Sequence, residues 1–148
     1  MTKEAARRCE EQIKKHEALR LKAYRDSLGN WTIGYGHCDR MIADGDTITK
    51  EKAEELFVKD FVSAYFDAKR LVCAAWDAMG DARQAAIVSM SFNMGFSGLK
   101  GFAKMIGALE AKDYQKAADE MLASKWAKQT GKRAIELSQQ MRTGEWQK

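Results

Sequence analysis

The feature that most constrains this fold is a long amphipathic segment that begins near Lys50. The stretch Gly45-Asp46-Thr47-Ile48-Thr49 ahead of it is expected to close a small sheet and to cap a helix. Apolar residues then recur at steps of three and four, which predicts one long helix with a continuous apolar face. These residues are Ala53, Leu56, Phe57, Phe61, Ala64, Tyr65, Ala68, Leu71 and Val72.

The chain ahead of this helix changes from a helical to an extended pattern. Thr2 is a suitable N-cap, and residues 3–19 are rich in Ala, Glu, Lys and Arg, which are strong helix formers. Glu17 is therefore expected in the last helical turn, where the macrodipole disfavours a second negative charge and favours a protonated carboxyl. Residues 21–35 have an extended pattern interrupted by the turn residues Leu28-Gly29-Asn30, which predicts a short hairpin.

Three residues of this region, Glu17, Asp26 and Thr32, have the chemistry of a glycoside hydrolase. Such an enzyme needs a carboxylic acid to protonate the leaving oxygen, and a carboxylate or hydroxyl on the far side to direct a water. If Asp26 and Thr32 hold that water, the two carboxyl groups are expected to lie roughly 6.5–9.5 Å apart and the anomer to be inverted. The simpler alternatives are that Asp26 caps its own turn and that Thr32 is an ordinary strand residue.

The stretch E-A-L-R-L-K-A-Y-R-D-S-L-G-N-W-T-I-G-Y-G-H, residues 17–37, resembles the active-site signature of the phage-type lysozymes, or endolysins. Residues 49–57, 81–86, 90–95 and 142–146 resemble helices of the same family in the same order. The resemblance implies hydrolysis of the β-1,4 bond between N-acetylmuramic acid and N-acetylglucosamine in peptidoglycan, for host cell lysis. It also implies that Glu17 is the proton donor, Asp26 the second carboxylate, and Thr32 the hydroxyl that helps to hold water.

Two residues beside Glu17 depart from the family's usual pattern. The family usually has Gly directly after the catalytic Glu, whereas this chain has Ala18. If that position is helical, Ala is harmless or stabilising. His16 precedes the Glu, and a charged imidazole there would favour the ionised carboxyl.

The remainder of the chain has a helical pattern. Residues 82–94 are apolar nearly all round, which predicts a helix buried at the centre of a bundle. Gly95, Gly98 and Gly101 then break the chain, Asp113 is expected to cap a short helix, and Ser124 marks a boundary before a last helix from Gly131 to Arg142.

These elements predict an α+β, lysozyme-like fold of one domain, residues 1–148. A small lobe of about residues 14–55 would carry the hairpin or three-stranded sheet. A helical lobe would comprise about residues 70–148 with the N-terminal helix, and a substrate cleft would lie between the lobes. The resemblance implies that Phe92 and Asn93 line this cleft, that Arg133 approaches Glu17, and that these three residues bind the substrate. Phe92 could instead be plain core, and Arg133 a solvated helix charge.

The hairpin and the long helix are also expected to share an ion pair. Asp60 falls on the apolar face of the helix, where a lone carboxylate is costly to bury. His37, at the end of the hairpin, is the candidate partner, and the resemblance suggests it too. Pairing would raise the pKa of His37 above about 6.5. The alternative is that Asp60 reaches solvent at the rim of the apolar face.

Composition excludes several other classes of protein. The 148 residues are 45% hydrophobic, which suits a single core, and the net charge of +4 suits an anionic cell wall but falls short of a nucleic-acid binder. No stretch is apolar enough for a membrane span, and the N-terminus lacks a signal peptide's apolar core. We therefore expect a monomer without stable membrane insertion, made in the host cytoplasm and acting on the wall after release by a separate membrane-permeabilising protein.

Cysteine usage argues against a disulfide framework and against a metal site. The three cysteines, Cys9, Cys38 and Cys73, are an odd number without paired spacing, so reduced thiols are expected. Cys38 directly follows His37, but two adjacent ligands without a second cluster make a poor zinc site. We expect neither a metal nor a cofactor.

Two alternative functions remain open. A lytic transglycosylase would cleave the same bond with Glu17 alone and form an anhydro sugar, and Asp26 and Thr32 argue against it. A non-catalytic wall-binding or membrane-binding protein would use the basic C-terminal third, although an amphipathic surface helix needs a cleaner apolar face. The basic residues are Lys125, Lys128, Lys132, Arg133 and Arg142.

Overall fold

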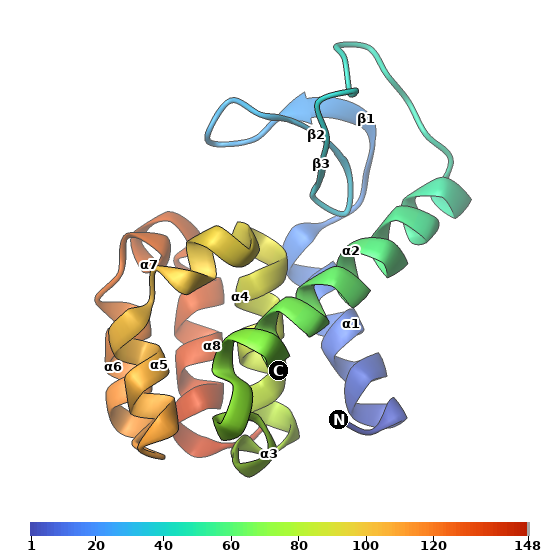
Figure 1. The fold of residues 1–148 in the computed structure, drawn as a ribbon. Coiled ribbons are helices and arrows are strands. Elements are labelled where there is room, and N and C mark those ends of the chain that lie inside the picture. Colours follow the sequence, from blue (N-terminus) through green and yellow to red (C-terminus); the bar gives the residue numbers. More distant parts are fainter. Residues whose placement is uncertain (148) are drawn as a thin grey trace.

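The computed structural model describes residues 1–147 and has the predicted α+β fold (Figure 1). A three-stranded sheet lies at one end of the molecule, a cluster of helices lies at the other, and the long helix α2 runs between them. No helix within these residues is long and apolar enough to cross a membrane. The elements are α1 (Lys3–Glu17), β1 (Arg20–Arg25), β2 (Trp31–Gly34), β3 (His37–Cys38), α2 (Lys50–Val72), the 3₁₀ helix η1 (Cys73–Ala75), α3 (Trp76–Met79), α4 (Asp81–Lys100), α5 (Ala103–Glu110), α6 (Tyr114–Leu122), α7 (Lys125–Thr130) and α8 (Lys132–Thr143).

Four helices begin at polar caps; Thr2, Thr49 and Asp113 were predicted as caps, whereas Ser124 was predicted only as a boundary ahead of the last helix. The side chains of Thr2, Thr49, Asp113 and Ser124 each accept a hydrogen bond from the backbone N–H three residues further on. A chain without proline depends on such caps, because each satisfies an N–H group that the helix itself leaves unpaired. The predicted helix starts are therefore confirmed.

The sheet is antiparallel in the order β1-β2-β3. Thr32 pairs with Tyr24 on one side and with Cys38 on the other, so it occupies the central strand. The β1–β2 turn is closed by Asp26, whose Oδ1 accepts the backbone N–H groups of Leu28 and Asn30 at 2.9 and 2.8 Å. The structural alternative, in which Asp26 caps its own turn, is therefore present.

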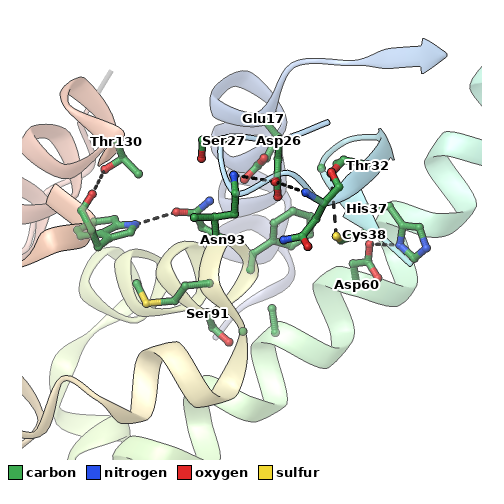
Figure 2. Close-up of a pocket in the computed structure, with 18 of the residues that line it drawn as sticks. Glu17, Asp26, Ser27, Thr32, His37, Cys38, Asp60, Ser91, Asn93 and Thr130 are labelled. Carbon is green, nitrogen blue, oxygen red and sulfur yellow. Dashed lines mark hydrogen bonds and ion pairs between the residues drawn. The ribbon is translucent and has the colours of Figure 1, made fainter. Parts of the chain in front are cut away.

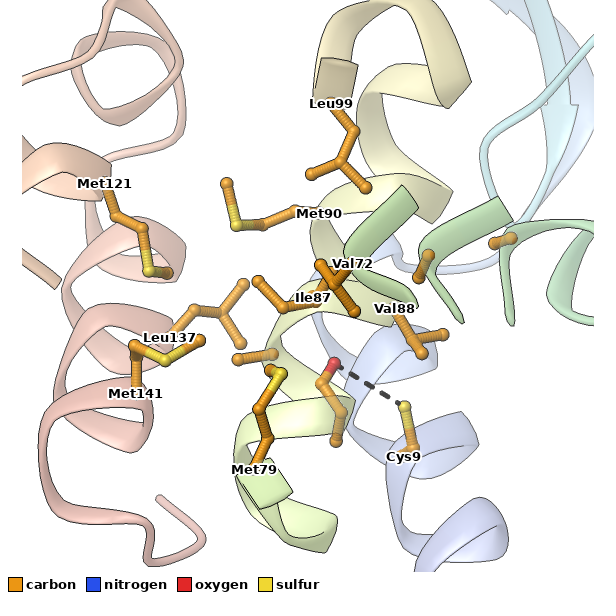
Figure 3. Packing of buried hydrophobic residues seen from close by; sticks show 14 of the residues in the cluster. Cys9, Val72, Met79, Ile87, Val88, Met90, Leu99, Met121, Leu137 and Met141 are labelled. Atoms are coloured by element: carbon orange, nitrogen blue, oxygen red, sulfur yellow. Dashed lines mark hydrogen bonds between the residues drawn. The ribbon is translucent and has the colours of Figure 1, made fainter. Parts of the chain in front are cut away.

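The main hydrophobic core lies between the helices, with α4 at its centre (Figure 3). Residues of α4 meet side chains from α1, α2, α6 and α8, and those labelled in the figure include Cys9, Val72, Ile87, Val88, Met90, Met121, Leu137 and Met141. Fully burying one such apolar side chain contributes about 1.5–3 kcal/mol. The prediction of a buried central helix is confirmed as far as Ser91.

Between Phe92 and Gly98, α4 lies outside the buried core, which differs from the predicted burial through Met94; Leu99 is buried again. Asn93 is exposed, and Phe92 and Met94 are half-buried. Gly95 then takes positive φ (77°) and kinks the helix, as a glycine can without steric cost. The apolar pattern continues because Phe92 and Met94 line a cleft and are not enclosed in the core.

Helix α1 ends two residues earlier than predicted, because Ala18 is not helical. Its backbone has φ 56° and ψ 145°, a region that is essentially reserved for glycine and costs another residue about 1–3 kcal/mol. The condition under which Ala18 would be harmless, a helical conformation, is therefore not met. This residue turns the chain from α1 into β1 and leaves Glu17 as the last residue of the helix.

Candidate active site

A cleft of about 590 Å³ lies between the sheet and the helices (Figure 2). Glu17, Asp26 and Thr32 line it from the end of α1 and from the hairpin, and Phe92 and Asn93 line it from α4. The fold thus brings these five predicted residues to one cavity. The rest of the lining is rich in hydroxyl and amide groups, which suit a polar, uncharged ligand; these come from Ser27, Asn30, Ser63, Ser91, Gln129 and Thr130.

Glu17 is held from one side by Arg133. The Nη1 of Arg133 donates to Oε1 of Glu17 at 2.6 Å, and the Glu17 side chain is only 14% exposed. Arg133 is itself held by Ser89, whose Oγ and carbonyl oxygen accept from Nη2 at 3.1 and 3.3 Å. The positive charge of Arg133 lies beside the negative end of the α1 macrodipole. It therefore offsets the field of that helix end at the Glu17 carboxyl group.

Arg133 does not line the cleft itself. The residue is 8% exposed, so the alternative of a solvated helix charge is wrong. It was also predicted to bind substrate, but its side chain lies behind Glu17 and contacts the carboxyl group. The predicted approach of Arg133 to Glu17 is present.

Gly36 encloses Glu17 from the other side. A Cβ atom built on Gly36 would lie 2.5 Å from Oε2 of Glu17, closer than such atoms approach each other, and Gly36 also has positive φ (73°). Only a residue without a side chain therefore leaves Glu17 in place. No local pattern indicates this role for Gly36, although the residue belongs to the G-Y-G-H end of the signature.

Asp26 and Thr32 combine local structural roles with exposure to the cleft. Oδ1 of Asp26 holds the turn, whereas Oδ2 accepts no hydrogen bond within residues 1–147. Thr32 is buried in the central strand, and its Oγ1 donates to the carbonyl oxygen of Asn30 at 3.0 Å. The Thr32 hydroxyl therefore keeps its lone pairs available, because its proton is already used.

Phe92 and Asn93 close the cleft on the helical side. The Phe92 ring packs 5.3 Å from the ring of Phe57, centroid to centroid, so it belongs both to the core and to the cleft wall. Oδ1 of Asn93 accepts the indole N–H of Trp126 at 2.8 Å. This bond fixes the amide and leaves its two N–H donors for another partner.

His16 pairs with Glu136 and not with Glu17. Its Nε2 lies 2.7 Å from Oε2 of Glu136. Burial lowers the pKa of His16, so the imidazole is largely neutral near pH 7. The expected influence of a charged His16 on Glu17 is therefore weak at neutral pH.

Cys38 is a further cleft residue that the sequence analysis did not place there. All three cysteines are free thiols, and burial raises the pKa of Cys9. Cys38 is exposed, lines the cleft, and has its Sγ 4.0 Å from Oγ1 of Thr32. Within residues 1–147, no three His, Cys, Asp or Glu side chains are grouped as metal ligands.

The predicted pair of His37 and Asp60 is confirmed. Nδ1 of His37 lies 2.8 Å from Oδ2 of Asp60, and the two side chains are 19% and 32% exposed. The hydrogen bond to Asp60 raises the pKa of His37, and Asp39, 3.8 Å away, adds to this. The pair ties β3 to α2, so it links the sheet to the long helix.

We predict that this pair makes the free energy of unfolding depend on pH. Because the folded pKa of His37 is raised, the stabilisation is complete below the unfolded value of about 6.5 and is lost as pH rises through the folded pKa. For a partly exposed pair the effect is about 1 kcal/mol or less. Urea unfolding across this pH range, with NMR titration of His37, should show the dependence in the wild type and lose it in Asp60→Asn, whereas Asp39→Asn should change it little. Identical His37 titration curves in the wild type and Asp60→Asn would rule it out.

Comparison with known proteins identifies the family. The phage lysozyme family matches residues 14–143. The chain is 37% identical to the endolysin of Salmonella phage P22 over 78% of this chain and 79% of that protein. It is 35% identical to the endolysin of Acyrthosiphon pisum secondary endosymbiont phage 1, over 82% of this chain and 80% of the relative.

A third relative is a much larger protein. The chain is 31% identical to the pre-baseplate central spike protein Gp5 of Enterobacteria phage T4, over 90% of this chain but only 27% of that protein. The family predicted from the signature is therefore confirmed, and the chain belongs to the phage lysozyme family of peptidoglycan-lytic enzymes.

Proposed function

We propose that this chain hydrolyses the β-1,4 bond between N-acetylmuramic acid and N-acetylglucosamine in peptidoglycan. The observation that carries the proposal is the shared cleft, in which the carboxyl group of Glu17 and the side chains of Asp26 and Thr32 come from two different elements. An acid and a water-directing group on separate elements can act on opposite faces of one sugar ring.

Glu17 is proposed as the general acid. Its carboxyl group would donate a proton to the glycosidic oxygen as the bond breaks. Arg133 and Gly36 support this role by holding the carboxyl group in one position. We therefore assign Arg133 to positioning Glu17 and not to direct contact with the glycan.

Asp26 and Thr32 are proposed to hold the attacking water. Oδ2 of Asp26 is available to accept a proton from that water, and the Thr32 hydroxyl can accept a hydrogen bond from its other proton. With both protons directed toward the protein, an oxygen lone pair is directed toward the anomeric carbon. Phe92 and Asn93 would contact the glycan from α4, the ring by packing and the amide through its N–H groups.

Two alternatives are less well supported. Family membership argues against the non-catalytic wall-binding protein. A lytic transglycosylase cleaves the bond without an attacking water and needs no residues to hold one. The presence of Asp26 and Thr32 in the cleft therefore favours hydrolysis. In its biological setting we propose a monomeric endolysin, made in the host cytoplasm and given access to the wall by a separate membrane-permeabilising protein.

Glu17→Gln is expected to remove the acidic proton while keeping the shape of the side chain and an oxygen that can accept the hydrogen bond from Arg133, so the fold should persist. The rate should fall by at least 10²- to 10⁴-fold, the usual contribution of a general acid. Mass spectrometry of digested peptidoglycan should show wild-type products that carry a reducing end and are one water heavier than anhydro sugars. The matched control is Glu136→Gln, which removes a nearby charge outside the cleft. Near-normal turnover by Glu17→Gln, or anhydro products from the wild type, would contradict the proposal.

Gly36→Ala is expected to reduce activity far more than it reduces stability. The added methyl group must displace the Glu17 carboxyl group, whereas in the control Gly45→Ala the residue also has positive φ (88°) but its methyl group would meet nothing within 4 Å. Both variants should therefore lose roughly 1–3 kcal/mol of unfolding free energy from backbone strain. Only Gly36→Ala should also lose about 10²-fold or more in kcat, since misplaced catalytic groups have costs of this size. An equal loss of activity in the two variants would mean that Gly36 does not position Glu17.

A further inference from the structure

The carboxylate of Glu54, near the start of α2, joins two other elements of the small lobe. Its Oε1 accepts a hydrogen bond from the hydroxyl of Tyr35 at 2.9 Å, and its Oε2 accepts one from Nζ of Lys14. The bond to Lys14 lowers the pKa of Glu54, so the carboxylate is ionised at neutral pH and both oxygens can accept. Because Lys14 belongs to α1 and Tyr35 to the β2–β3 turn, this one side chain connects three elements.

The Tyr35 side chain is held along its ring as well as at its hydroxyl. The residue is only 9% exposed, and its ring packs edge-on against the ring of Phe57, with the centroids 5.5 Å apart. Nζ of Lys14 lies 5.2 Å from the centroid of Tyr35 and 4.8 Å from that of Phe57, within the range of a cation–π contact. These contacts fix where the Tyr35 side chain lies relative to α1 and α2.

The turn that carries Tyr35 depends on such contacts for its position. Tyr35 lies between two glycines with positive φ, 68° and 73°, and glycines have no side chain to anchor a turn. Gly36 is therefore held by the side chains on either side of it, those of Tyr35 and His37. The His37 anchor ends on α2, at Asp60, whereas the Tyr35 anchor continues from α2 to Lys14 of α1.

The contacts of Glu54 complete a ring around the proposed general acid. Lys14 lies three residues before Glu17 on α1, about one helical turn away. From the opposite side Gly36 approaches Glu17 so closely that an added Cβ atom would lie 2.5 Å from Oε2. Because Tyr35 directly precedes Gly36, a movement of Tyr35 relative to α1 also moves Gly36 relative to Glu17.

We propose that Glu54 is a positioning residue for the general acid, because it holds Tyr35 and Lys14 together and so keeps the Gly36 backbone against the Glu17 carboxyl group. Its catalytic consequence rests on the proposed function. Among residues 1–147, those that line the cleft do not include Glu54, Tyr35 or Lys14, so these three act without contacting the glycan. Their loss should therefore lower kcat and leave KM unchanged, whereas an ordinary ion pair on the surface would affect neither.

The kinetic test removes the two ends of the Tyr35–Glu54 bond in turn. Glu54→Ala keeps a good helix former in α2, and Tyr35→Phe removes only a hydroxyl. Each should lower kcat for reducing-end formation roughly tenfold and leave KM within about twofold of the wild type, at temperatures well below unfolding. The matched control is Glu55→Ala, which removes an exposed carboxylate one position further along α2 and should keep the wild-type kcat.

The double variant tests whether the two residues act through one contact. Glu54→Ala, Tyr35→Phe should be only as slow as Glu54→Ala, because the Tyr35 hydroxyl then has no partner left to lose. Multiplied losses in the double variant would overturn the proposal, and so would a Glu54→Ala variant with the same kcat as Glu55→Ala.

A measurement on the free protein separates this proposal from the proposed function. In Glu54→Ala and in Tyr35→Phe, the backbone amide signal of Gly36 should shift and its NMR order parameter should fall below the value of about 0.85 that is typical of rigid backbone. In Glu55→Ala both should match the wild type. No substrate is present, so the result holds even if the wild type forms no new reducing ends, an outcome that would sink only the proposed function. An unchanged Gly36 signal in both variants would overturn the role of Glu54.

Discussion

The contact between Glu17 and the buried Arg133 is the interaction on which the site depends. It joins the end of α1 to α8, and it places an acid that is 14% exposed between a guanidinium on one side and the glycine of the β2–β3 turn on the other. Truncating either side chain leaves the other charge without its hydrogen-bond partner in a poorly solvated place, which costs more free energy than the pair itself contributes. Because β1 begins three residues after Glu17, whatever fixes α1 also fixes where the hairpin starts.

In the hairpin, Asp26 and Thr32 stabilise the local structure and also line the cleft. Oδ1 of Asp26 accepts the hydrogen bonds that close the turn, whereas Oδ2 accepts none within residues 1–147. The Thr32 hydroxyl donates its proton to a backbone carbonyl oxygen. Small sheets have little core of their own, and this one is anchored to α2 through His37 and Asp60. The supporting bonds therefore fix the side chains of the hairpin that we propose to bind the water, as a preorganised site requires.

Local patterns in the sequence predicted what local physics determines. Helix caps such as Thr49, the long apolar face of α2, and the turn at Asp26 depend on neighbours in the chain, and the structure has them as expected. Features that depend on tertiary distance were missed: the burial of Arg133, the close approach of Gly36 to Glu17, and the loss of burial in α4 between Phe92 and Gly98. The conformation of Ala18 was also missed, although the Gly that the family usually has at this position is typical of positive φ.

The anomeric configuration of the first product tests the central claim most directly. If Glu17 protonates the leaving oxygen while Asp26 and Thr32 direct water to the opposite face, the configuration at the anomeric carbon is inverted in a single displacement. Proton NMR of a soluble glycan digest, recorded before mutarotation, should then show the new reducing end first as the α anomer. A β anomer appearing first, or a covalent glycosyl adduct on Asp26, would mean that Asp26 is a nucleophile and would contradict this account.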